Sequence, residues 1–119
     1  MKPVLFTAQQ QQDLSPWEPI ASPLSEPCST HRAAETEIAQ YPGTSMGIWD
    51  CTPGIWRRGL MQREYCYFLS GHCFFTPDGG ETLEIKAGDS IFFPQQTHGT
   101  WDVRETVRKA FFIMGDQPV

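Results

Sequence analysis

The side chains that could bind a metal ion in this 119-residue chain are three histidines and four cysteines. Imidazole and thiolate are preferred ligands of zinc and other transition metals. Cys66, Cys73 and a histidine could together supply three ligands, but no C-x-x-C spacing indicates a zinc site. The candidate that remains is His98, which follows a glycine turn, a predicted strand and a proline in AGDSIFFPQQTHGTWDV, residues 87–103.

The elements that must position these side chains are predicted to be short strands from residue 44 onward. SMGIWDC (45–51) alternates apolar with small or polar residues, which is typical of a strand. The aromatic segment 64–76 is also strand-like, and its Ser70-Gly71 pair predicts a tight hairpin. PDGG at 77–80 predicts a second turn, since proline presets φ and glycine allows positive φ.

The remaining segments complete an all-β pattern. SIFFP (90–94) predicts a short, fully buried strand. Residues 100–114 predict two strands with a connection near Glu105. About eight short strands separated by turns indicate a β-sandwich or a barrel of the jelly-roll type.

Residues 1–40 differ from the rest of the chain. They contain five prolines and a run of four glutamines at 9–12, so regular secondary structure is not expected over much of their length. We predict an extended N-terminal arm over 1–40, ordered in part and lying on the body of the fold or on a partner subunit. A single barrel domain is predicted over 41–119.

Composition excludes several partners. The formal net charge is −5, and the only local basic cluster contains Arg57, Arg58 and Arg63, so nucleic acid is not an expected partner. No apolar run is long enough to span a membrane, and the N-terminus does not resemble a signal peptide. We therefore expect a cytoplasmic protein with reduced, mostly buried cysteines. Exposed hydrophobic strands and the arm favour a homodimer, with the arm at or near the interface.

The order and spacing of several motifs resemble the cupin superfamily over residues 47–114. GIWDCTPG at 47–54 places a tryptophan-containing strand before a Pro-Gly turn, and Gly88 to Lys109 reads GD-x-I-F-F-P…G-T-W-x-V-x-E-x-V-R-K. The chain is similar to short single-domain cupins related to (S)-ureidoglycine aminohydrolases and to the ethanolamine-utilisation cupin. The resemblance implies a double-stranded β-helix, that is, a jelly-roll barrel.

The resemblance also implies four metal-ligand positions, which can be checked individually. Counting back from Gly71, Glu64 takes the carboxylate position. The first two histidine positions fall on Arg58 and Leu60, or on Arg57 and Gly59 if the spacer before Glu64 is one residue longer. The last histidine position falls on Gly99 rather than on His98. A one-residue offset turns an extended side chain to the opposite face. Three of four ligands are thus missing, and we predict neither a metal of the usual kind nor another cofactor.

A pocket remains as the expected site. Because side chains alternate along a strand, Glu64, Cys66 and Phe68 share one face. The resemblance implies that this face points into the barrel. A carboxylate inside an apolar barrel must be paired or protonated, and Arg58 is the expected partner. Either these two groups bind a small ligand, or they form an internal ion pair in the lost metal site. The predicted ligand-binding residues are Trp49, Trp56, Phe93, His98, Trp101 and Lys109.

Three functions are compatible with these features. The first is a small-molecule-binding cupin of unknown ligand, without the usual metal centre and without catalysis. The second is an enzyme of the ureidoglycine aminohydrolase or isomerase kind, with Glu64 as acid or base and Arg58 or Lys109 assisting. The third is a structural dimerisation module.

Overall fold

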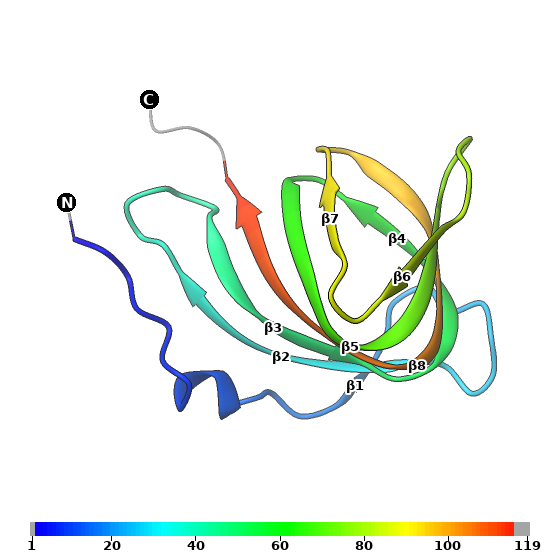
Figure 1. Cartoon of the computed structure of the whole chain (residues 1–119), viewed down its shortest axis with the longest axis horizontal. Helices are drawn as coiled ribbons and strands as arrows, with labels where there is room; N and C mark the ends of the chain where they lie inside the picture. Colours follow the sequence, from blue (N-terminus) through cyan, green and yellow to red (C-terminus); the bar gives the residue numbers. More distant parts are fainter. Residues whose placement is uncertain (1, 116–119) are drawn as a thin grey trace.

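Eight antiparallel strands dominate the computed structural model, which describes residues 2–115 (Figure 1). The hydrogen-bonded order is β1-β2-β3-β8-β5-β6, while β4 also pairs with β8 and β7 with β5. A short 3₁₀ helix, η1 (Gln10–Gln12), precedes the sheet. The strands are β1 (Glu18–Pro19), β2 (Thr30–Glu37), β3 (Ser45–Cys51), β4 (Gly54–Leu60), β5 (Arg63–Pro77), β6 (Leu83–Lys86), β7 (Ser90–Phe93) and β8 (Thr97–Met114). The predicted all-β fold is confirmed.

Two long strands, β5 and β8, are shared between the two halves of a barrel. Residues 64–67 of β5 pair with β7, whereas 72–75 pair with β6. Likewise, residues 107–113 of β8 pair with β3, whereas 97–103 pair with β4. Because β5 and β8 also pair with each other, both strands curve strongly, and the sheet closes around an interior (Figure 1).

The hairpin predicted at Ser70-Gly71 and the connection predicted near Glu105 are both wrong. β5 and β8 pass through these points without reversing, and their register shifts there between Phe68 and Cys73. Gly71 has φ +94°, and a Cβ on it would overlap the Thr106 carbonyl of β8. The positive φ therefore serves a bulge that bends both strands, rather than a turn. The turn predicted at 77–80 is confirmed, with Gly79 at φ +75°.

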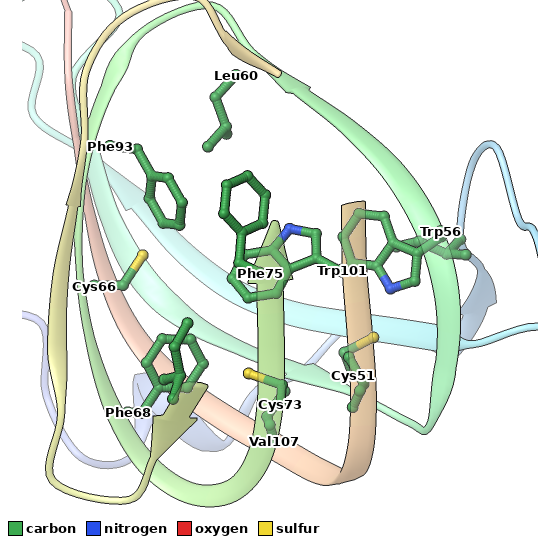
Figure 2. Close-up of a cluster of buried hydrophobic side chains, with 13 residues drawn as sticks. Cys51, Trp56, Leu60, Cys66, Phe68, Cys73, Phe75, Phe93, Trp101 and Val107 are labelled. Carbon is green, nitrogen blue, oxygen red and sulfur yellow. The ribbon is translucent and has the colours of Figure 1, made fainter. Parts of the chain in front are cut away.

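Aromatic side chains fill the barrel interior. Trp56 and Trp101 stack with ring centroids 6.0 Å apart, and Phe75 contacts both Trp101 and Phe93 (Figure 2). All four residues are almost fully buried. Burial of each such side chain contributes roughly 1.5–3 kcal/mol to folding, so this cluster is a principal source of the barrel's stability.

The predicted full burial of 90–94 is wrong. Within β7 only Phe93 is buried, and Phe92 is 53% exposed. Phe92 lies opposite Tyr65 of β5, which in turn lies opposite Phe112 of β8. This row forms part of the outer face, so β7 is apolar on both faces although only one of them is covered.

The N-terminal segment contributes two strands to the sheet. β2 pairs with β3 along its whole length, and β1 pairs with β2. On the outer face Asp50 accepts hydrogen bonds from Arg32 and Arg108 at 2.7–2.9 Å, and the ring of Trp17 lies 4.3 Å from the Arg32 guanidinium. Residues 15–37 therefore lie on the body of the fold, whereas the boundary at residue 40 stays a prediction. No helix among residues 2–115 is long and apolar enough to cross a membrane.

Candidate functional site: a tryptophan-lined pocket in the barrel

A pocket of about 230 Å³ opens on the inner face of the sheet. Its walls come from β1, β2, β3, β4, β5 and β8, and Ser15 closes part of its rim. Of the residues predicted from the sequence, six line this pocket: Trp49, Trp56, Arg58, Glu64, Trp101 and Lys109. Segments far apart in the chain are thus brought to one cavity.

The base of the pocket contains a buried ion pair. Lys109 Nζ lies 3.2 Å from Glu64 Oε2, and the Cys66 thiol donates to the same oxygen at 2.9 Å. Glu64 and Lys109 are only 3% and 7% exposed. β5 and β8 are neighbours, and alternation within each strand turns these side chains to the same interior.

The ion pair keeps both groups charged despite their burial. Burial by itself raises the pKa of Glu64, but Lys109 and the Cys66 thiol outweigh it, so the pKa lies below its usual value. Burial by itself lowers the pKa of Lys109. The negative charge that Cys66 or Glu64 can carry outweighs burial, so the pKa of Lys109 lies above its usual value. Burial raises the pKa of Cys66 to about 12, so this sulfur is a thiol at neutral pH. Glu64 is therefore a carboxylate held by two donors.

Two tryptophans complete the surroundings of Lys109. Its Nζ lies 4.6 Å from the ring centroid of Trp49 and 5.4 Å from that of Trp101. Cation–π contacts of this kind are worth about 2 kcal/mol when they are desolvated. The ammonium is thus held by one carboxylate and two aromatic faces.

Trp49 is oriented by a hydrogen bond to His31 of β2. The indole Nε1–H donates to His31 Nδ1 at 3.1 Å, which requires an unprotonated Nδ1. Burial, followed by the charge of Arg58, lowers the pKa of His31, and Glu18 only partly opposes this. His31 is therefore neutral at pH 7 and can accept this bond, a role that no sequence pattern predicts.

Arg58 lines the pocket without pairing with Glu64, so its predicted ion pair is wrong. It projects to the same side of β4 as the buried Trp56 and Leu60. Within the described chain, residues 2–115, no acidic group lies within 4.0 Å of its guanidinium. Lys109 takes the place beside Glu64 instead.

A family model described as the EutQ-like cupin domain matches residues 40–111, more than half of the chain. The chain belongs to the EutQ-like cupin family. No curated protein matches it. The predicted resemblance to short single-domain cupins is thus confirmed.

Solved structures share this cupin fold. The ethanolamine utilization protein Q of Salmonella typhimurium LT2 is 22% identical, with a TM-score of 0.61 over 75% of this chain and 72% of that one. The EutQ protein of Clostridium difficile is 16% identical, with a TM-score of 0.65 over 80% and 77%. A DUF861-family protein of unknown function from Pseudomonas syringae pv. tomato is 23% identical, with a TM-score of 0.75 over 88% of this chain but 46% of that one. At these identities the likeness shows the fold alone.

The residues at the four cupin ligand positions do not fit a metal ion. Arg58 and Leu60 face inward at the first two, Glu64 is held by Lys109 at the third, and Gly99 takes the fourth. A Cβ on Gly99 would overlap the Phe75 ring, so Phe75 fills the space into which a histidine there would project. Within residues 2–115, no group of three or more His, Cys, Asp or Glu residues is arranged to hold a metal.

Two predicted ligand-binding residues lie away from the pocket. His98 is exposed and lies opposite Gly59 of β4. A Cβ added to Gly59 would lie 2.8 Å from the Nδ1 atom of His98. It therefore projects to the outer side of β4, as the one-residue offset from Gly99 implies. Phe93 is buried in the core and does not contact the cavity. Neither residue lines the pocket, although the Phe93 ring packs against Trp101 with centroids 5.8 Å apart.

The partnership of Lys109 with Glu64 was missed from the sequence. A signal existed, because alternation places Lys109 on the same face of β8 as Val107 and Phe111. A lysine in such an apolar row must find a carboxylate or an aromatic partner inside the barrel. Here it finds both.

Proposed function

We propose that this EutQ-like cupin binds a small molecule in its barrel, without the usual cupin metal centre and without catalysing a reaction on it. The observation that carries the proposal is a pocket lined by three tryptophans, with a buried, fully paired Glu64–Lys109 unit at its base. Apolar walls with a few fixed polar groups are typical of small-molecule sites.

The size of the pocket supports a small metabolite. Pockets for drug-sized ligands measure about 300–1,000 Å³, and this one measures about 230 Å³. The tryptophan faces offer stacking area, while Glu64 and Lys109 present a fixed dipole at the base. Such an arrangement favours a ligand with a compact apolar body and one or two polar groups.

The alternative of an enzyme that uses Glu64 as acid or base draws little support from this arrangement. A general acid or base works best when its pKa lies near the working pH. The pKa of Glu64 is instead lowered, and its carboxylate is held by Lys109 and Cys66. A carboxylate in this setting is suited to binding and structure.

A thermal-shift screen of metabolites tests the proposal, with Ala33→Phe as the pocket-filling variant. Ala33 lines the cavity from β2, and a phenyl ring there would occupy it. We expect at least one compound to raise the Tm of the wild type, because a ligand that binds only the folded state stabilises it. Ala33→Phe should abolish this rise. Compounds that stabilise both proteins equally would contradict binding in the pocket.

The homodimer and the place of the arm near its interface remain proposals. The outer face carries the exposed cross-strand row Phe92, Tyr65 and Phe112, and Leu5 of the arm lies beside it, 80% exposed. A second copy covering this row would remove apolar surface from water. Sedimentation of the wild type and of Tyr65→Lys measures the oligomeric state. We expect the wild type to sediment as a dimer and Tyr65→Lys as a monomer.

A further inference from the structure

The charges of the pocket are unevenly satisfied. Three arginine or lysine residues line it, and the side chains of two of them have acidic partners. Arg32 is bound to Asp50 on the outer face of the sheet at 2.9 Å, and Lys109 is bound to Glu64. Arg58 differs, since neither a carboxylate nor any other described side chain accepts a hydrogen bond from it in residues 2–115.

Arg58 lines the cavity from β4 and is itself exposed, so its charge lies where the cavity meets solvent. Alternation along β4 places Trp56, Arg58 and Leu60 on the inner side, whereas Arg57 faces outward and donates to both carboxylate oxygens of Asp78. Beside the larger effect of burial, the charge of Arg58 also contributes to the pKa values of His31, Glu64 and Lys109, which lie on three other strands. Its guanidinium therefore acts across the pocket.

Acidic groups on the pocket wall do not neutralise Arg58. Glu35 accepts a hydrogen bond from the Ser45 hydroxyl at 2.8 Å, and Glu18 lies opposite His31 in the β1–β2 pair. Neither forms an ion pair with Arg58. Glu64 is already held by two donors. Among the described residues 2–115, no side chain therefore occupies the hydrogen-bonding positions of the Arg58 guanidinium.

We infer that Arg58 binds the carboxylate group of a small monoanionic ligand whose apolar body packs against Trp49, Trp56 and Trp101. A guanidinium presents a rigid fork of donors that matches the two oxygens of a carboxylate. The tryptophans offer flat apolar faces next to it. This inference rests on the proposed function and adds the chemical class of the ligand.

Three probes of nearly equal shape test the inference: phenylacetate, phenylacetamide and 2-phenylethylamine. Binding to the full chain is followed by NMR titration of the tryptophan indole N–H signals. Because hydrogen bonds to charged groups contribute about 1.5–3 kcal/mol, phenylacetate should bind at least about tenfold more tightly than either other probe. Arg58→Met should lower its affinity by about the same factor and leave the amide unaffected.

Arg57→Met is the matched control, because it removes the neighbouring arginine on the opposite face of β4. It should leave phenylacetate binding unchanged. If the amide or the amine binds as tightly as the acid, or if Arg58→Met has no effect, the inference is overturned while binding in the pocket stands. If none of the three probes binds the wild type, the inference is overturned; the proposed function fails as well only if no compound of the thermal-shift screen binds in the pocket.

Discussion

The ammonium of Lys109 lies 3.2 Å from the carboxylate of Glu64, and both groups are buried inside the barrel. The motif spacing predicts that Glu64 takes the carboxylate position of a cupin metal site, and in this chain Lys109 of β8 neutralises it. This relationship links the two long strands that shape the barrel. It also sets the charge at the base of the pocket.

Loss of one partner of this pair should destabilise the protein strongly. In Lys109→Met the Glu64 carboxylate stays buried without a countercharge, and we expect a loss of about 3–5 kcal/mol in the free energy of unfolding. The double variant Glu64→Gln/Lys109→Met should recover much of this loss, because no buried charge remains. Urea unfolding of the wild type, both single variants and the double variant measures the coupling. A loss in the double variant equal to the sum of the two single losses would show that the pair is not coupled.

Gly71 should tolerate alanine less well than Gly79, although both have positive φ. A methyl group on Gly71 overlaps the backbone of Thr106, whereas nothing lies within 4 Å of that position on Gly79. Gly79→Ala should therefore cost about 1 kcal/mol through backbone strain alone, and Gly71→Ala clearly more. Thermal unfolding of both variants gives the comparison. Equal changes in Tm would argue against close packing of β5 on β8 at this bend.

The alternation of side chains predicted much of the site, and cross-strand contacts account for what was missed. Parity along β5 correctly placed Glu64, Cys66 and Phe68 inward, as their burial shows. The partner of Glu64 was misassigned because Lys109 is 45 residues away, and its proximity depends on the β5–β8 register. Gly71 was taken for a turn because positive φ serves turns and bulges alike. Local sequence does not distinguish these two uses.

Acid should weaken the fold through His31. Its folded-state pKa is lowered, so the folded protein binds fewer protons than the unfolded chain as pH falls below about 6.5. The stability that His31 contributes is present above that pH and is lost as pH falls through the folded-state pKa. His31→Gln, which keeps an acceptor for Trp49, should therefore lose less stability than the wild type between about pH 6.5 and 5. Urea unfolding at a series of pH values tests this, and parallel curves would contradict it.

Glu64 should act in a lower pH range. The pKa of Glu64 in the folded protein is also lowered. The stability that Glu64 contributes is therefore present above its pKa in the unfolded chain, near 4.5, and is lost as pH falls below that value. Glu64→Gln should remove this second decline while leaving the decline caused by His31. If Glu64→Gln changes stability only above about pH 6, the assignment of the two ranges is wrong.

The thiols should differ sharply in reactivity. Burial raises the pKa of Cys51 to about 11 and those of Cys66 and Cys73 to about 12, so these thiolates are scarce at pH 8. Cys28 is only partly buried, and all four thiols are free. A thiol reagent should modify Cys28 in the native protein and all four after denaturation. Cys28→Ser should abolish the native reaction. Rapid modification of Cys66 would contradict the closed base of the pocket.

The most direct test of a tryptophan-lined ligand pocket is an indole N–H NMR spectrum recorded with the compound that raises the Tm most. Each of the four tryptophans gives its own signal. Trp49, Trp56 and Trp101 line the pocket, whereas Trp17 lies against Arg32, which binds Asp50 on the outer face, and so provides an internal control. The account predicts that the first three signals shift and that the signal of Trp17 stays in place. A spectrum in which only Trp17 shifts, or in which no tryptophan responds to any compound, would contradict it.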